Sequence, residues 1–284
     1  MKILLTGSAG QLGRELVVAL QPLGEVLATD RRTLDLADLD AMRATVRRTA
    51  PRVIVNAAAY TAVDKAESEP DLAMRVNAQA PGLLAEEAKR LGALMIHFST
   101  DYVFDGAKRT PYVETDAVNP VSAYGRSKAA GEQAVRASGC RHVILRTGWL
   151  YAGHGSNFAL TMLRKGREVP RLRVVSDQRG APTWARDLAD LAKGLLAKSA
   201  PPEGTYHASA AGETSWHEYA SELLRLAHIA TPVDAIASAD YPTAARRPMY
   251  AVLDSSLLES VSGVRRIGDW RQRLSEFTSG LKSA

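Results

Sequence analysis

The sequence of 284 residues has a single cysteine, Cys140, so the chain cannot form an internal disulfide. The residues around Cys140 supply neither an adjacent base nor the spacing of a metal site, and we therefore expect it to be a small buried core residue. Stability must then come from apolar packing. A chain of this length can bury an ample core without a metal or a disulfide.

Hydrophobic runs are short: none approaches the roughly 20 residues that span a bilayer. Met1 is followed directly by the strand-like segment 2–5 instead of the charged and apolar regions of a signal peptide. Internal repeats, low-complexity tracts and charge blocks are also lacking. These absences predict a cytoplasmic protein without a membrane partner.

A concentrated basic stripe is lacking as well. The net charge is +5, but arginine pairs such as Arg31–Arg32 and Arg246–Arg247 are spread along the chain. A protein that binds nucleic acid gathers such charges on one face. We therefore predict no nucleic-acid partner and expect an anionic small molecule, such as a sugar nucleotide, as the ligand.

Short apolar runs alternate with amphipathic segments through the first half of the chain. The predicted strands are 3–6, 26–29, 53–56, 94–99 and 143–147, and the predicted helices are 12–20, 39–49, 70–91 and 123–137. This order is typical of parallel β-α-β units, and fully apolar strands indicate a sheet that is covered on both faces. The predicted fold class is therefore α/β, a Rossmann-type doubly wound parallel sheet with its ligand at the carboxyl ends of the strands.

The alternation weakens after Thr147, where loops containing Gly and Pro separate shorter elements. This change predicts a smaller C-terminal α/β lobe for the substrate. We place an NAD(P)-binding domain at residues 1–150, with a return of the chain to it near 174–198. Residues 151–284 are expected to form mainly the substrate lobe.

Three glycines, Gly7, Gly10 and Gly13, follow the first predicted strand and open the first helix. Without side chains, the loop can turn tightly, bring its N–H groups to a pyrophosphate, and let the helix pack close to the sheet. The GxxGxxG spacing resembles that of the extended branch of the short-chain dehydrogenase/reductase superfamily. A dinucleotide cofactor is therefore predicted.

The cofactor is predicted to be NADH or NADPH. Asp30 ends the second strand, where a carboxylate would accept hydrogen bonds from the ribose hydroxyls and disfavour a 2′-phosphate. Arg31 and Arg32 come next and could instead pair with that phosphate, so both cofactors remain open. Further contacts are expected beside the glycine loop and at strand ends, from Gln11, Leu12, Asp35, Leu36, Ala57, Ala58, Ala59 and Tyr60.

A ketone that accepts hydride needs a proton and stabilisation of the developing negative charge. Tyr124 is the candidate acid. Lys128, one helical turn later, is expected to lower the pKa of the phenol and to contact the nicotinamide ribose. Thr100 follows an apolar strand, and its hydroxyl can donate to the carbonyl oxygen. Tyr124, Lys128 and Thr100 are therefore the predicted catalytic residues, the first two also as cofactor contacts.

Longer segments resemble the dTDP-4-dehydrorhamnose reductases over nearly the whole chain: STDYVFDG at 99–106, NAAAYTAVDKAE at 56–67 and ARRPMYAVLD at 245–254. The resemblance implies reduction by NAD(P)H of the C4 ketone of dTDP-6-deoxy-L-lyxo-4-hexulose, which gives dTDP-L-rhamnose. It also implies substrate contacts from Val63, Thr100, Asp101, Trp149, Arg246 and Arg247. Plain packing at Val63, an ordinary core role for Trp149 and a solvated pair at Arg246–Arg247 are the alternatives.

Members of this family are often magnesium-dependent dimers, so Mg²⁺ and a homodimer are implied by the resemblance. Their metal ligands do not map onto this C-terminal region, and we predict no metal residue. Two other functions remain open: a nucleotide-sugar epimerase or dehydratase, and a non-catalytic regulatory subunit that binds the cofactor. A dehydratase typically carries Asp-Glu after the strand-final Thr, whereas this chain has Asp101–Tyr102, which argues against a dehydratase. The presence of Thr100, Tyr124 and Lys128 together favours an enzyme over a regulatory subunit.

Overall fold

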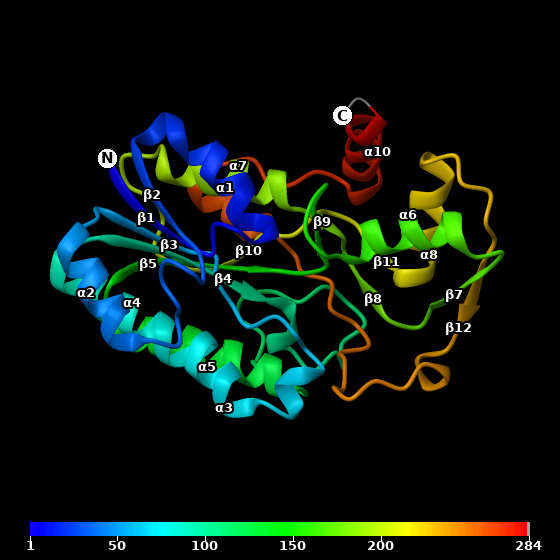
Figure 1. The fold of residues 1–284 in the computed structure, drawn as a ribbon, viewed down its shortest axis with the longest axis horizontal. Coiled ribbons are helices and arrows are strands. Elements are labelled where there is room, and N and C mark those ends of the chain that lie inside the picture. The colour runs from blue at the N-terminus through cyan, green and yellow to red at the C-terminus, as the bar shows by residue number, and fades with distance from the viewer. Residues whose placement is uncertain (283–284) are drawn as a thin grey trace.

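A parallel sheet forms the centre of the larger half of the molecule in the computed structural model, which describes residues 1–282 (Figure 1). Its strand order is β10-β5-β4-β3-β1-β2. The strands are β1 Lys2–Thr6, β2 Glu25–Thr29, β3 Val53–Asn56, β4 Leu94–Thr100, β5 Arg141–Thr147 and β10 Gly204–His207. The chain runs from β1 to β2 on one side and then to β3 on the other, which creates a switch point at the carboxyl ends of β1 and β3.

Helices cover both faces of this sheet (Figure 1). One face carries α1 (Gln11–Leu20) and α7 (Ala185–Leu196), and the other carries α2 (Leu39–Thr49), α4 (Ala80–Leu91) and α5 (Ala123–Ser138). Every residue of β3 and β4 is buried, as their apolar sequences require. The predicted α/β doubly wound sheet is confirmed.

The helix predicted over 70–91 is not a single regular helix. It consists of α3 (Pro70–Met74), a π-helical turn at Arg75–Gln79, and α4. The side chain of Asn77, inside this turn, accepts a hydrogen bond from N of Tyr60 at 2.8 Å and donates to O of Tyr60 at 3.0 Å. Hydrophobic periodicity does not report such a turn, because the apolar face continues through it.

The smaller half lies at the right of Figure 1 and contains α6 (Phe158–Glu168), α8 (Trp216–Leu226), and the parallel pair β7 (Leu172–Val175) and β12 (Val233–Ile236). The chain returns to the larger half through α7, which lies within the range 174–198. β7 stays with β12, whereas α7 packs against α1 and β10 joins the sheet beside β5. Two short pairs complete the described strands: β6 (Leu150–Tyr151) with β9 (Thr183–Trp184), and β8 (Arg179–Gly180) with β11 (Thr214–Ser215).

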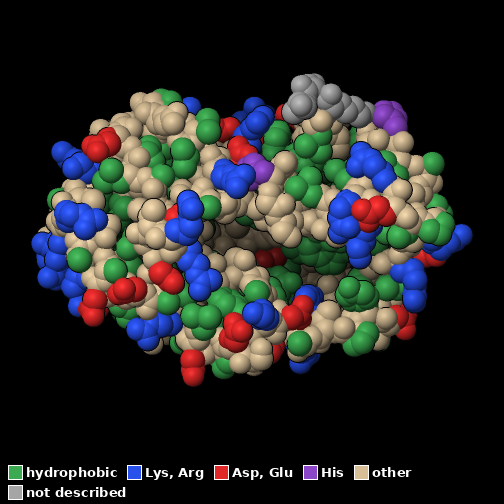
Figure 2. Space-filling model, viewed as in Figure 1, with side chains coloured by type: hydrophobic (Ala, Val, Ile, Leu, Met, Phe, Trp, Pro, Cys, Tyr) green, Lys and Arg blue, Asp and Glu red, His purple; other side chains and the backbone are tan. Residues whose placement is uncertain are grey.

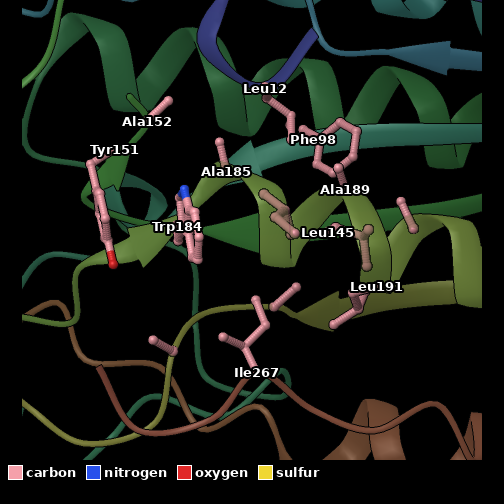
Figure 3. Packing of buried hydrophobic residues seen from close by; sticks show 14 of the residues in the cluster. Leu12, Phe98, Leu145, Tyr151, Ala152, Trp184, Ala185, Ala189, Leu191 and Ile267 are labelled. Atoms are coloured by element: carbon pink, nitrogen blue, oxygen red, sulfur yellow. The ribbon is translucent and has the colours of Figure 1, made fainter. Parts of the chain in front are cut away.

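One hydrophobic cluster extends across both halves. Figure 3 shows Leu12, Phe98 and Leu145 of the sheet half close to Trp184 and Tyr151, which lie on the short strands toward the smaller half. Because interiors are closely packed, a shared core holds the two halves in one arrangement. Cys140 is buried in a second cluster on the opposite face, as predicted.

The remaining helices are α9 (Ser256–Ser262) and α10 (Trp270–Lys282). Trp270, at the start of α10, is fully buried, and Arg273 donates to the carboxylate of Asp187 on α7 at 2.8 Å. These contacts hold the C-terminal helix against the rest of the chain. No described helix is long and apolar enough to cross a membrane.

Candidate active site

A cleft of about 670 Å³ runs along the carboxyl ends of the central strands and opens near the middle of the face in Figure 2. Its wall contains residues from both halves of the molecule. The lining includes fourteen of the residues predicted to contact the cofactor: Gly7, Gly10, Gln11, Leu12, Asp30, Arg31, Asp35, Leu36, Ala57, Ala58, Ala59, Tyr60, Tyr124 and Lys128.

The glycine loop is built for close backbone approach. Gly7 has φ +74°, and a Cβ there would lie 2.7 Å from N of Ala58. Gly13 packs inside the loop instead of lining the cleft, because a Cβ there would lie 2.0 Å from O of Gly7. Side-chain Oε1 of Gln11 is buried without a hydrogen-bond partner among residues 1–282. An N-terminal helix end with an unpaired polar group beside it fits a dinucleotide.

Asp30 is fixed at the edge of the cleft by its own turn. Its Oδ1 accepts from N of Arg32 and from N and Oγ1 of Thr33, each at 3.0 Å. The hydrogen bonds from Thr33 lower the pKa of this carboxyl, so it stays charged. The side chains of Arg31 and Arg32 are 82% and 90% exposed. Arg31 belongs to the described lining of the cleft, and Arg32 does not.

Tyr124 and Lys128 are positioned by the start of α5. Ser122 caps this helix by accepting from N of Gly125 at 3.1 Å. Gly125 allows close approach, since a Cβ there would lie 2.3 Å from O of Tyr102. Lys128 is buried, and its Nζ donates to O of Phe98 at 2.7 Å. Burial lowers the pKa of Lys128 to about 8.

The predicted direction of the pKa shift of Tyr124 is wrong. Burial raises the pKa of Tyr124 to about 12, and the nearby Thr100 side chain opposes that rise. The sequence instead predicts a pKa lowered by Lys128. Burial is the largest cause of this rise, and Nζ of Lys128 donates to O of Phe98 at 2.7 Å.

Thr100 ends β4, Asp101 begins the 3₁₀ turn that follows, and both line the cleft. Oγ1 of Thr100 donates to Oδ1 of Asp101 at 2.9 Å and accepts from N of Tyr102 at 3.2 Å. Burial raises the pKa of Asp101 to about 7, and its Oδ2 has no hydrogen-bond partner within the described chain. Gly148 makes room for this carboxyl, because a Cβ there would lie 2.3 Å from Oδ2.

Trp149, between β5 and β6, lines the cleft. Its backbone has φ +47°, an uncommon conformation for a bulky residue. The indole stacks on that of Trp216 with ring centroids 3.4 Å apart and planes inclined by 6°. It also covers Gly180, where a Cβ would lie 2.3 Å from the ring. Trp216 is therefore a supporting residue that site prediction from the sequence missed.

Three predicted substrate contacts lie outside the lining of the cleft as described: Val63, Arg246 and Arg247. Arg247 donates through Nη2 to Oδ2 of Asp64 at 2.8 Å. Its hydrogen bonds lower the pKa of Asp64. Arg246 is exposed, and Val63 is partly buried in a turn. Their contact with a substrate remains a prediction.

The family model described as "RmlD substrate binding domain" matches residues 1–283. The chain belongs to this family. The dTDP-4-dehydrorhamnose reductase of Burkholderia thailandensis is 44% identical, with 95% of this chain and 96% of that protein covered. That of Escherichia coli K12 is 45% identical, with 87% of each covered.

Solved structures agree with the RmlD family assignment. A dTDP-4-dehydrorhamnose reductase from Clostridium acetobutylicum matches with TM-score 0.95 and 40% identity, covering 99% of this chain and 100% of that one. The Bacillus anthracis enzyme, in complex with NADP, matches with TM-score 0.94 and 34% identity, covering 98% and 99%. A Thermus thermophilus UDP-glucose 4-epimerase, 21% identical, shows a similar fold. The predicted resemblance to the reductases is confirmed.

Some cleft residues of this RmlD family member were not predicted as site residues. The loop before α6 contributes Gly155 and Ser156, and Nε2 of His154 lies 2.9 Å from Oε1 of Glu15 on α1. The sequence marks this segment as a loop only. The other unpredicted lining residues come mainly from strand ends and the start of α3: Ala9, Leu34, Thr61, Leu72, Val76, Phe98, Ser99, Thr147, Gly148 and Leu150.

A metal site has no support in this RmlD family member. Within residues 1–282, no three His, Cys, Asp or Glu side chains lie close enough together to hold a metal ion. Mg²⁺ prefers several oxygen ligands, and a single chain supplies no such set in the described part. The described part of one chain therefore holds no such group of ligands, and no step below uses a metal.

Proposed function

We propose that this chain is an NAD(P)H-dependent dTDP-4-dehydrorhamnose reductase. It reduces the C4 ketone of dTDP-6-deoxy-L-lyxo-4-hexulose to dTDP-L-rhamnose, the last step in synthesis of that sugar donor. The supporting observation is one continuous cleft with the glycine loop along its wall and Thr100, Tyr124 and Lys128 on its floor. The names of the relatives agree with this reaction.

The cofactor would lie along the loop that contains Gly7 and Gly10, with its pyrophosphate at the start of α1 and its adenosine toward Asp30 and Arg31. Asp35, Leu36 and the Ala57–Tyr60 segment complete this part of the wall. When bound, the reduced nicotinamide supplies a hydride to C4 of the sugar. The relative that was solved with NADP supports NADPH as one cofactor, and NADH remains the other.

The protein supplies the proton and stabilises the charge. As C4 accepts hydride, its oxygen becomes negative, and the hydroxyl of Tyr124 transfers its proton to that oxygen. Thr100 donates a hydrogen bond to the same atom while the charge develops. A charged Lys128 favours the phenolate that remains on Tyr124 and is placed to bind the nicotinamide ribose.

The sugar would lie between β4 and the smaller half. Trp149 presents a rigid apolar face that suits a deoxysugar, and Asp101 lies beside the reacting ketone. Val63, Arg246 and Arg247 would contact the rest of the dTDP-sugar, the arginines through charge-assisted bonds to the diphosphate. In this assignment, residues 1–150 with α7 and β10 bind the cofactor, and most of 151–284 forms the substrate lobe.

A cytoplasmic location and a homodimer are further parts of the proposal. A cytoplasmic enzyme has direct access to nucleotide sugars and NAD(P)H, and the family resemblance implies two copies. Size-exclusion chromatography with light scattering of the purified chain gives the number of copies. A mass of one chain at the working concentration would contradict the dimer.

The experiment that tests the function is NADH and NADPH oxidation with the hexulose generated in situ, followed by identification of the product. Oxidation with dTDP-L-rhamnose formed establishes the reductase, and the two rates give the cofactor preference. A folded protein that binds cofactor but oxidises none would contradict the proposal. Tightly held NAD together with interconversion of sugars would indicate an epimerase. If no sugar is converted at all, a regulatory subunit would be indicated.

A further inference from the structure

A row of buried polar side chains crosses the sheet behind the cleft. Thr6, Asn56 and His97 lie on β1, β3 and β4 at one register level, Thr6 opposite Asn56 and Asn56 opposite His97. All three are at most 1% exposed. Oγ1 of Thr6 donates to Oδ1 of Asn56 at 2.6 Å, and Nδ2 of Asn56 lies 3.0 Å from Nδ1 of His97. The row continues to Lys128, whose Nζ lies 3.5 Å from Nε2 of His97.

The order of donors along this row fixes the tautomer of His97. An amide nitrogen donates and does not accept, so Nδ1 of His97 must be the acceptor for Asn56. In a neutral imidazole the other nitrogen then carries the hydrogen. Burial, and then the charge of Lys128, lower the pKa of His97 well below its ordinary value, so the ring is neutral. His97 therefore presents an N–H group to Lys128.

We propose that His97 is a positioning residue, which presents its Nε2–H to Nζ of Lys128 and thereby favours the neutral amine. An ammonium has three donors and no acceptor, so it gains nothing from a facing N–H group. A neutral amine has a lone pair that accepts from it. The inference rests on the proposed function in one respect, the catalytic role of Lys128.

Other charged groups near Lys128 and His97 also shift the pKa values of these two residues. Glu132, one turn later on α5, raises the pKa of Lys128, although burial dominates and lowers it. The Glu132 carboxylate is shared with Arg146 of β5, at 2.7 Å, and with Arg136 of α5, at 3.1 Å. On the His97 side, His142 of β5 adds a smaller effect that also lowers the pKa of His97. His97 and Glu132 thus oppose each other, which keeps both forms of Lys128 accessible for proton exchange.

The first test uses the unmodified protein and needs no activity. Long-range ¹H–¹⁵N correlation spectra of protein labelled at histidine nitrogens report which ring nitrogen carries the hydrogen, with the His97 ring assigned by through-bond correlation to its own backbone. The proposal predicts a neutral ring protonated at Nε2 over the pH range of folding. A ring protonated at Nδ1, or an imidazolium, would overturn it whatever the enzyme catalyses.

The second test is the pH profile of kcat/KM for His97→Asn. The shorter amide can still accept from Asn56 through its oxygen, and it lacks the Nε2–H that faces Lys128. If reduction needs charged Lys128, activity is lost as pH rises through the pKa of Lys128. The variant should therefore lose activity at a pH higher than wild type by about 0.5–1 unit. His228→Asn, a substitution of another histidine outside the cleft lining described above, should leave the profile in place.

The outcomes separate the two proposals. A folded His97→Asn protein whose alkaline limb coincides with that of wild type would overturn the role of His97 and leave the reductase intact. A general loss of kcat without a shift would also contradict it, because that result indicates a structural role. If the variant does not fold, or if the wild type reduces no hexulose, the tautomer in the unmodified protein decides.

Discussion

At the scale of single residues, burial sets the chemistry of the cleft. It raises the pKa of Tyr124 and of Asp101 and lowers that of Lys128, so each group is favoured in its uncharged form. A phenol with a high pKa keeps its proton until an oxyanion develops beside it. Tyr124 is therefore suited to donate a proton to a substrate oxygen that becomes negative during the reaction.

Thr100→Val tests the second donor to the oxyanion. Valine keeps the shape of the side chain but loses the hydroxyl that is expected to donate to the C4 oxygen. Since loss of one such donor costs about 100-fold or more in the chemical step, we expect that decrease in the single-turnover rate of NADPH oxidation. Binding of NADPH should change little. A single-turnover rate equal to that of wild type would exclude Thr100 from the chemistry.

Asp101→Asn tests how strongly the cleft disfavours a carboxylate. The folded-state pKa of Asp101 is raised from 3.8 to about 7, so the folded protein loses stability as pH rises between these values. Asparagine removes this loss. The difference in unfolding free energy, variant minus wild type, should therefore be roughly 1–4 kcal/mol greater at about pH 8 than at about pH 5.

Urea unfolding at the two pH values measures this difference. Asp240→Asn, at an exposed position in a 3₁₀ turn, is the matched control and should show no such gain. If Asp101→Asn and wild type differ by the same amount at both pH values, the burial effect on Asp101 is refuted.

At the scale of elements, α5 has to approach its neighbours closely in order to place Tyr124 and Lys128. Gly131 lies where α5 meets the π-helical turn, and a Cβ there would lie 2.0 Å from O of Asn77. On its other side, α5 carries Glu132, whose carboxylate is completely buried against Arg146. The helix that bears the proposed acid is thus fixed on two sides.

Gly131→Ala should destabilise the protein by about 1–3 kcal/mol, because the added methyl group meets backbone that cannot move freely. Gly280→Ala is the control within another helix, α10, where a Cβ would have no atom of the described chain within 4 Å. That change should stabilise by roughly 0.5–1 kcal/mol through the better helix propensity of alanine. Equal effects of the two substitutions on urea unfolding would contradict the close approach at Gly131.

Much of the structure at the scale of elements could be predicted from the sequence. The apolar runs and glycine spacing predict the first five strands and the loop, because a covered parallel sheet requires them. The π-helical turn and the entry of β10 into the sheet could not be predicted, since they depend on Asn77 and on pairing with β5. The stack of Trp149 on Trp216 joins residues far apart in the chain, and no local pattern marks it.

At the scale of the whole molecule, the cleft lies between two halves that share one core. Trp184 and Trp270 are buried in that cluster, and Trp149 and Trp216 pack against it. The cleft therefore depends on the whole core, because its lining comes from both halves.

A shared core predicts one cooperative unfolding transition. The chain has four tryptophans, all in or against this cluster, whereas far-ultraviolet circular dichroism reports all helices and strands. In urea, the two signals should change together, with coincident midpoints. Two separated midpoints would mean that the halves unfold independently and that the cleft can be lost while the sheet persists.

The most direct test of the central claim is the rate of NADPH oxidation by Tyr124→Phe with the hexulose as substrate, measured beside its affinity for NADPH. Phenylalanine keeps the ring and removes the proton that C4 oxygen must receive. The account predicts a decrease of about 100-fold or more in turnover, with NADPH affinity nearly unchanged. A Tyr124→Phe protein that retains most of the wild-type turnover would contradict it.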